Sequence, residues 1–305
     1  MLTAFTFPGQ GSQFPGMLRE NLPDDPTAHS YLSHAESALG QTITSIDSES
    51  ALKETVNVQL ALLISGVIWG KYLMHKGCVP DYVMGLSVGA YPAAVLAGCL
   101  SFEDALQLVS LRGRLMQTAF PQDYGMLALL NVNRTVVESV LEQQVIEGKR
   151  VYLANINAED QFVLAGYKPA LLETAAVIKS KTRCTSRLLE VAVPSHCSLL
   201  KDQSEYLLSK LEKTIINRPK IRYISASKSR LINNIDDIRK DLSHNMANQV
   251  HWHDSSQLLL ERGVGRVVEI PPGSTLTGLC RRVFTQGQCF AAQSTRLDTL
   301  LYQHL

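Results

Sequence analysis

Residues 85–89, with the sequence GLSVG, form the most informative pattern in the chain. A G-x-S-x-G pattern is typical of a nucleophile elbow, in which a serine sits on a tight, strained turn between a strand and a helix. The two glycines permit the close backbone approach that a Cβ would block. The flanks fit, because residues 82–84 predict a short buried strand and residues 90–98 an apolar helix. An ordinary glycine-rich turn has the same pattern, but this context favours a nucleophile at Ser87.

A serine nucleophile needs a base, and His196 is the best placed of the eight histidines. It follows an apolar segment, and loops at strand ends are where folds present catalytic groups. A buried histidine with only a structural role fits this spacing equally well. His251 and His253 have the H-x-H spacing of a metal site, but no third ligand is evident, so the sequence predicts no metal.

Arg112 stands where a charged residue is costly. Residues 102–119 predict a helix whose apolar residues recur at helical spacing; Arg112 falls within this stripe, whereas Arg114 faces the polar side. A buried guanidinium destabilises the fold unless an anion pairs with it. That anion is either an internal Asp or Glu, or a substrate carboxylate held by two hydrogen bonds. The pattern alone leaves both alternatives open.

The loop at residues 9–11 (GQG) follows a predicted strand at residues 2–7. It lacks the full G-x-G-x-x-G spacing and the lysine of a phosphate-binding loop, so nucleotide binding is not favoured. A loop in this position can instead offer backbone N–H groups to a developing oxyanion.

Composition excludes several classes of protein. The chain of 305 residues has 29 Lys and Arg against 28 Asp and Glu, without the basic excess of a nucleic-acid binder. Its six cysteines are scattered, which indicates reduced thiols and a cytoplasmic location. Residues 82–102 are uncharged and long enough to span a bilayer, but their glycines and Pro92 favour a buried core. We expect no signal peptide, no membrane span and no nucleic-acid partner.

Strands and helices alternate around these candidates, which predicts a parallel α/β architecture. Between residues 125 and 193 the predicted order becomes β-α-β-β-α-β, the split unit of ferredoxin-like folds. We therefore expect a large α/β domain from residues 1–124 and 194–305, with a small ferredoxin-like insert at 125–193. The insert's expected strands are residues 126–132, 151–156, 161–165 and 186–193, and its helices 135–145 and 169–180. The large domain's other expected helices are residues 58–69, 199–214, 235–248, 255–262 and 274–284, and its other strands 221–226 and 266–270.

Taken together, these segments resemble the malonyl-CoA:acyl-carrier-protein transacylase family. The matching segments are residues 7–13 (FPGQGSQ), 85–89 (GLSVG), 111–113 (LRG), 193–196 (VPSH) and 272–279 (PGSTLTGL). They occur in the family's order and span nearly the whole chain. The resemblance implies a large α/β hydrolase-like domain with a small ferredoxin-like insert.

The resemblance also implies a role for each candidate residue. Ser87 is the acylated nucleophile, and His196 acts as its general base and then as an acid. Arg112 holds the free carboxylate of the malonyl group. The backbone N–H groups of Gln10 and Val88 form the oxyanion hole.

Two further positions match the family more loosely. Asn245 stands where the family usually has a glutamine whose carbonyl orients the histidine. A backbone carbonyl survives this exchange, whereas a side-chain carbonyl has a shorter reach. Gln59 matches a glutamine that lines the family's substrate pocket.

Two positions of the elbow depart from the family's usual Gly-His-Ser-x-Gly-Glu. Leu86 replaces the histidine and Ala90 replaces the glutamate. With residues 269–273 (EIPPG), they resemble the epsilon subunits of malonate decarboxylase, which are dedicated malonyl transferases. This resemblance implies malonyl transfer from malonyl-CoA to a carrier thiol through a malonyl-serine. The implied partners are an acyl carrier protein with a phosphopantetheine-type group and other malonate decarboxylase subunits, and no tightly bound cofactor is implied.

Three alternatives stay open. A housekeeping transacylase of fatty-acid synthesis uses the same elbow with an ordinary carrier protein. A serine thioesterase or hydrolase releases malonate to water. A non-catalytic scaffold subunit is supported only by Leu86 and Ala90.

Overall fold

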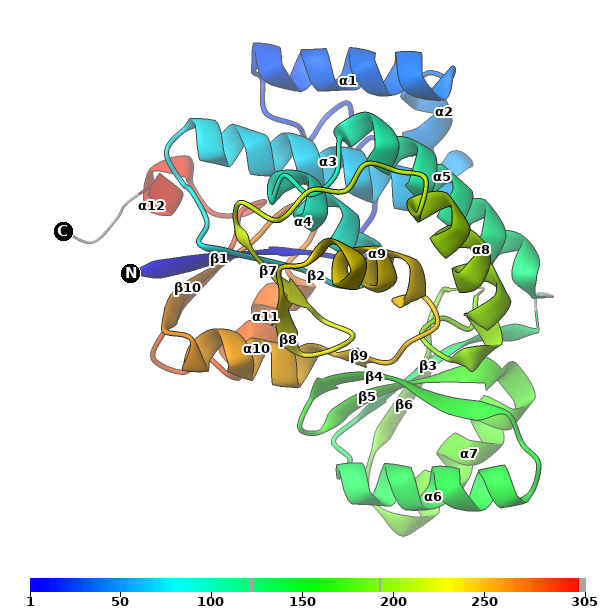
Figure 1. The fold of residues 1–305 in the computed structure, drawn as a ribbon. Coiled ribbons are helices and arrows are strands. Elements are labelled where there is room, and N and C mark those ends of the chain that lie inside the picture. The colour runs from blue at the N-terminus through cyan, green and yellow to red at the C-terminus, as the bar shows by residue number, and fades with distance from the viewer. Residues whose placement is uncertain (121–122, 192, 302–305) are drawn as a thin grey trace.

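The computed structural model describes residues 1–120, 123–191 and 193–301, and its strands form two sheets (Figure 1). The larger sheet has six strands in the order β11-β10-β1-β2-β7-β8. They are β1 (Leu2–Phe7), β2 (Tyr82–Gly85), β7 (Arg222–Ser225), β8 (Arg230–Ile232), β10 (Val264–Glu269) and β11 (Gln288–Ala291). All neighbouring pairs run parallel except β7 and β8.

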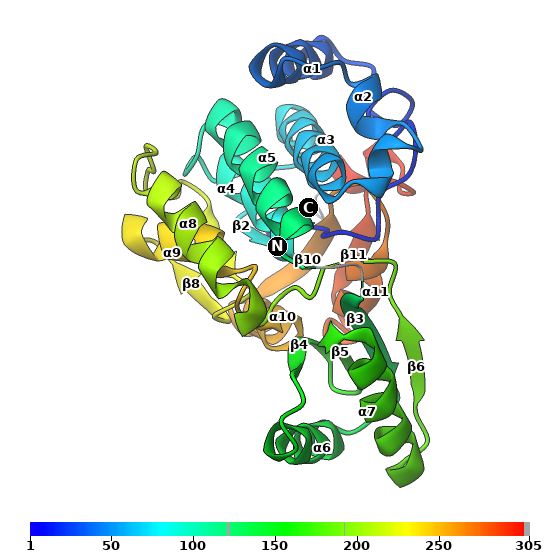
Figure 2. The same ribbon diagram turned by 90° about the vertical axis from the view of Figure 1, so that its right-hand side faces the viewer.

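Helices cover both faces of this sheet (Figure 2). Alternation along β1 explains why: Phe5 and Phe7 enter one apolar cluster, with α3 and α4, whereas Ala4 enters another, with α10 and α11. The helices and helical turns of this part are α1 (Pro26–Leu39), α2 (Thr44–Asp47), η1 (Ala51–Lys53), α3 (Thr55–His75), η2 (Ser87–Gly89), α4 (Ala90–Leu96), α5 (Phe102–Ala119), η3 (Ser198–Leu200), α8 (Lys201–Leu211), α9 (Ile235–His244), α10 (Trp252–Glu261), α11 (Thr275–Arg281) and α12 (Leu297–Leu301).

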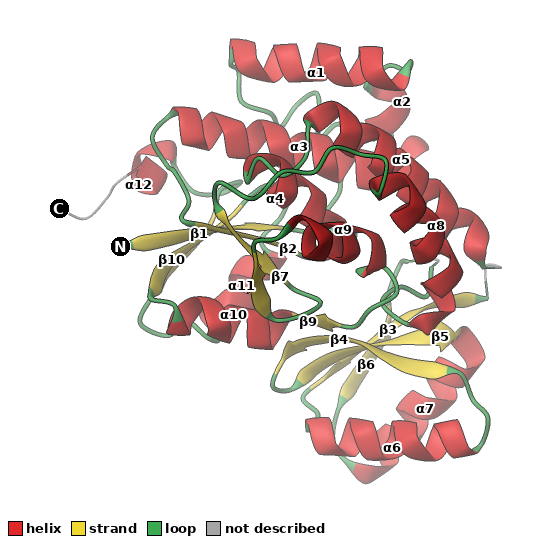
Figure 3. Cartoon of the chain, viewed as in Figure 1, coloured by secondary structure: helices red, strands yellow, loops and turns green. Residues whose placement is uncertain are grey.

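The smaller sheet has five strands in the order β6-β3-β5-β4-β9. They are β3 (Tyr124–Leu130), β4 (Val151–Ala158), β5 (Gln161–Tyr167), β6 (Thr185–Leu188) and β9 (Val250–His251). With α6 (Arg134–Ile146) and α7 (Lys168–Lys181), the first four strands follow the expected order β-α-β-β-α-β (Figure 3). The fifth, β9, lies outside residues 125–193 and pairs in parallel with β4.

The helix α3 is long and apolar enough to cross a membrane, but 72% of its most apolar 18-residue stretch is buried inside the protein. It is therefore a core helix, as the apolar pattern of residues 58–69 predicts. The helix α5 has the expected bounds, and it begins at Phe102 because Ser101 accepts a hydrogen bond from the Asp104 N–H and so caps its first turn.

Several expected elements end earlier than the pattern indicates, and two of them differ most at their carboxyl ends. The helix expected at residues 235–248 ends at His244, because the chain turns there and the Ala247 N–H bonds to the His244 carbonyl. The strand expected at residues 186–193 ends at Leu188, where its pairing with β3 stops. That expectation also runs through residue 192, which lies outside the described residues.

Candidate active site

Ser87 sits on a strained turn between β2 and α4. Its φ is +56°, in the left-handed region that non-glycine residues rarely adopt. A Cβ on Gly85 would collide with the backbone of Gly89, and a Cβ on Gly89 would collide with the carbonyl of Phe7. Both glycines are therefore required by close backbone contacts, as the elbow pattern predicts.

The parallel pairing of β1 and β2 places the loop after β1 beside this elbow. Phe7 is in register with Gly85, and the Leu86 N–H donates to the Phe7 carbonyl over 2.9 Å. The carboxyl ends of both strands thus meet at one edge of the sheet. The loop with Gln10 and the turn with Val88 follow directly, so the two expected oxyanion donors belong to adjacent segments.

His196 is almost fully buried and is held in one orientation by backbone carbonyls. Its φ is +64°, and its backbone N–H donates to Met246 O over 2.7 Å. Its Nδ1 lies 2.7 Å from Asn245 O and 3.3 Å from Asn248 O. Carbonyls only accept, so Nδ1 carries the proton and Nε2 keeps a free lone pair. Burial, and secondly the charge of Arg112, lower the pKa of His196 to about 4, which keeps the imidazole neutral at pH 7.

Arg112 is fully buried and donates to three neutral acceptors. Nη1 lies 2.6 Å from Gln59 Oε1, and Nη2 lies 3.1 Å from both Ser87 Oγ and Asn245 Oδ1. Among the described residues no Asp or Glu forms an ion pair with Arg112, which argues against the internal-anion alternative. Burial lowers the pKa of Arg112 to about 10. The site thus holds a buried cation that has no acidic partner among the residues described.

Gln59 connects this cation to the loop after β1. It is fully buried on α3, and because its Oε1 accepts from Arg112, its Nε2 faces the other way. Nε2 donates to Gln10 Oε1 and to Met116 Sδ, each over 3.3 Å. The expected pocket position of Gln59 is therefore next to the guanidinium.

Asn245 contacts His196, Arg112 and Ser87, each with a different atom. Its backbone carbonyl holds His196, its Oδ1 accepts from Arg112, and its Nδ2 donates to Ser87 O over 3.4 Å. The loss of a longer glutamine side chain at this position therefore leaves the orienting carbonyl in place, because the backbone supplies it.

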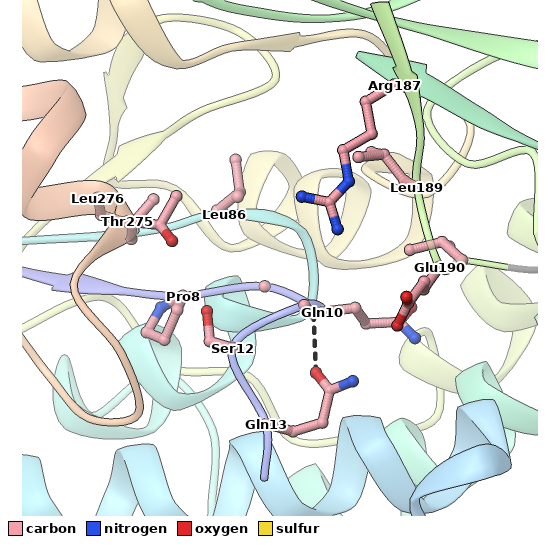
Figure 4. A pocket seen from close by; sticks show the side chains of 13 residues that line it. Pro8, Gln10, Ser12, Gln13, Leu86, Arg187, Leu189, Glu190, Thr275 and Leu276 are labelled. Carbon is pink, nitrogen blue, oxygen red and sulfur yellow. Dashed lines mark hydrogen bonds between the residues drawn. The ribbon is translucent and has the colours of Figure 1, made fainter.

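A cleft of about 530 Å³ opens beside the elbow (Figure 4). The loop after β1 and Leu86 form one wall, α11 contributes Thr275 and Leu276, and Arg187 reaches in from β6. The sequence did not single out Arg187, on the edge strand β6, or Glu190, just after it, because exposed polar residues carry no distinguishing pattern. Among the described residues, no group of three His, Cys, Asp or Glu side chains could hold a metal ion.

The comparisons with known proteins agree with this geometry. A model of the acyl transferase domain family matches residues 4–299. The malonyl CoA-acyl carrier protein transacylase of Escherichia coli O157:H7 is 34% identical over 285 residues, which cover 92% of this chain and 92% of the relative. That of Bacillus subtilis strain 168 is 33% identical over 306 residues, which cover 99% of this chain and 96% of the relative.

Solved structures have the same fold over nearly the whole chain. The malonyl CoA-acyl carrier protein transacylase of Coxiella burnetii superposes with a TM-score of 0.92 at 31% identity, over 99% of this chain and 96% of that one. A malonyl-transacylase in complex with its type II PKS acyl-carrier protein has a TM-score of 0.91 at 30% identity, over 99% of both chains.

Proposed function

Because the chain belongs to the acyl transferase domain family, among its malonyl-CoA:acyl-carrier-protein transacylases, we propose a role for the serine of its elbow. Ser87 carries a malonyl group from CoA to a carrier thiol. The observation that carries this proposal is the contact between the buried, unpaired Arg112 and the Ser87 hydroxyl. A substrate carboxylate supplies the missing countercharge, and it does so next to the nucleophile.

The acyl-enzyme forms in the first half-reaction. Ser87 Oγ attacks the thioester carbonyl carbon while its proton passes to His196 Nε2. The Gln10 and Val88 N–H groups stabilise the oxyanion of the tetrahedral intermediate. When the C–S bond breaks, His196 returns the proton to the CoA sulfur and malonyl-Ser87 remains. Because Ser87 Oγ accepts the hydrogen bond from Arg112, its own proton stays available to His196.

The second half-reaction reverses these steps with a different thiol. The carrier's phosphopantetheine thiol gives its proton to His196 and attacks malonyl-Ser87. His196 then protonates the Ser87 oxygen as it leaves. The cleft beside Leu86 is the route by which both thioesters reach the elbow. We expect no tightly bound cofactor on this chain.

The acceptor is better described by the housekeeping alternative than by malonate decarboxylase. The relatives named above are acyl-carrier-protein transacylases, and the complexed one binds an acyl-carrier protein. A malonate decarboxylase carrier and its other subunits stay a second candidate, which rests on Leu86 and Ala90 at the elbow. We also keep the division into 1–124 with 194–305 and a ferredoxin-like insert at 125–193, together with a cytoplasmic location, as part of this proposal.

One experiment separates the functions. Mass spectrometry after mixing with malonyl-CoA should find a malonyl adduct on Ser87 and none on Ser87→Ala, and an unmodified wild-type protein contradicts the proposal. The acyl-enzyme is then offered water, an ordinary acyl carrier protein and a malonate decarboxylase carrier in competition. Transfer to the ordinary acyl carrier protein supports a transacylase. Transfer to the malonate decarboxylase carrier supports a decarboxylase subunit, and release of malonate to water supports a hydrolase.

A further inference from the structure

We propose that Asp241, which lies outside the catalytic contacts, is a positioning residue for this reaction: its carboxylate, bound by three hydroxyl groups, fixes α9 so that the Asn245 carbonyl holds His196. The inference rests on the proposed function for its kinetic test. Its structural test does not depend on that function.

Asp241 is a buried acid whose hydrogen-bond partners are hydroxyl groups. It is 2% exposed. Oδ2 accepts from Tyr223 Oη over 2.8 Å, and Oδ1 accepts from Ser227 Oγ over 2.8 Å and from Ser225 Oγ over a shorter distance. Burial raises the pKa of Asp241, whereas the three hydroxyl donors and, less strongly, Lys228 oppose that rise.

These donors come from β7 and the turn that follows it, so the carboxylate ties α9 to the larger sheet. Asp241 lies one helical turn before Asn245, and the Asn245 N–H donates to the Asp241 carbonyl over 3.0 Å. The carbonyl oxygen of the same residue, Asn245, accepts the hydrogen bond from His196 Nδ1. The path from the carboxylate to the imidazole is therefore one turn of helix.

A second bond fixes the same helix from the side of the elbow. Tyr91 is fully buried on α4, four residues after Ser87, and its hydroxyl donates to Leu242 O over 2.9 Å. The end of α9 is thus held between β7 and the helix of the nucleophile. Both attachments set its position relative to Ser87.

The cost of a buried carboxylate argues for such a role. An apolar side chain would pack α9 against β7 without desolvating an acid. Packing alone tolerates small shifts of a helix, whereas hydrogen bonds to three donors restrict both its translation and its rotation. Catalytic groups lose activity when they move by about 1 Å, so the gain lies in the placement of the Asn245 carbonyl.

The test compares Asp241→Asn and the milder Ser227→Ala, which removes one donor, with Asp237→Asn as the matched control. Asp237 is on the same helix but pairs with Lys228 and Arg230 near the surface. We measure the rate of Ser87 acylation by malonyl-CoA per folded molecule and the His196 tautomer by ¹⁵N NMR of histidine-labelled protein. Circular dichroism measures the folded fraction.

In the wild type and in Asp237→Asn, His196 should carry its proton on Nδ1. Asp241→Asn should lower the acylation rate about 10-fold or more and populate the Nε2–H tautomer; Ser227→Ala should change both less, in the same direction. Wild-type rates and an unchanged tautomer in both variants overturn the inference, even if stability falls. If malonyl-CoA fails to acylate the wild type, the proposed function fails, while the tautomer still tests Asp241.

Discussion

Arg112 Nη2 donates a hydrogen bond to Ser87 Oγ over 3.1 Å, so the group that we propose binds an anion touches the group that we propose attacks the thioester. In a malonyl thioester a single methylene separates the carboxylate from the reacting carbonyl. An anion receptor in contact with the nucleophile therefore matches a short acyl group. A longer diacid whose carboxylate is bound by Arg112 should place its carbonyl farther from Ser87.

Arg112→Ala should change the choice of acyl group more than it changes the chemistry. A hydrogen bond to a charged group contributes about 1.5–3 kcal/mol, so kcat/KM for malonyl-CoA should fall roughly 10- to 150-fold. Acetyl-CoA has no carboxylate, and its transfer should be kept or increased. Arg112→Lys should not restore malonyl transfer, because an ammonium lacks the planar fork. Unchanged acyl selectivity in Arg112→Ala contradicts the assignment of this residue.

The pH dependence should report the lowered pKa of His196. That pKa is about 4, against an ordinary value of 6.5, so the neutral base persists well below pH 6. Acylation should therefore be nearly constant from pH 6 to 8 and fall as the pH approaches about 4. The same shift makes stability rise with pH between about 4 and 6.5, because the unfolded state binds the proton more tightly there.

Arg112 supplies part of that shift, which gives the pH prediction an internal control. Replacing it with glutamine removes a positive charge that lowers the pKa of His196. The acid limb of acylation by acetyl-CoA should then move to higher pH in Arg112→Gln. Rapid-quench measurements of the acylation rate across the pH range give the acid limb of the wild type and that of Arg112→Gln. An acid limb at the same pH in the two proteins would show that the charge of Arg112 does not reach the base.

The sequence predicts local features of the site better than its contacts. The elbow glycines and the bounds of α5 follow from short-range patterns, namely backbone contacts and a capping serine. The hydrogen-bond partners of Arg112 do not follow from such patterns. The apolar stripe around Arg112 indicates only that its guanidinium is buried. Whether a carboxylate or Gln59 lies opposite depends on how α3 packs against α5.

The end of α9 shows the same limit. The polar and apolar pattern continues past His244, yet the chain turns so that the Asn245 and Asn248 carbonyls both face His196. Periodicity gives no signal for this turn. The helix α1 is not among the elements that we expected from the sequence. Its ends nevertheless carry recognisable capping residues, namely Asp25, Pro26 and Gly40.

The strained elbow predicts different outcomes for two small substitutions. Ser87→Ala keeps the backbone and should abolish the malonyl adduct with little loss of stability. Gly89→Ala places a Cβ against the Phe7 carbonyl and should lower both acylation and the free energy of unfolding, by roughly 2 kcal/mol or more. Thermal denaturation and adduct mass spectrometry distinguish the two. A Gly89→Ala protein with normal stability contradicts the close contact between the turn and β1.

Gln59→Glu tests the missing countercharge most directly. The substitution preserves shape and places a carboxylate where Gln59 Oε1 now accepts from Arg112 over 2.6 Å. An internal ion pair should form in place of the bound substrate carboxylate, so KM for malonyl-CoA should rise more than about 10-fold. Thermal stability should rise, because the buried cation gains a partner. Gln257→Glu adds the same charge on the exposed face of α10, outside the lining of the cleft, and should leave both values near wild type. Malonyl transfer at the wild-type KM in Gln59→Glu would mean that the guanidinium does not bind the substrate carboxylate.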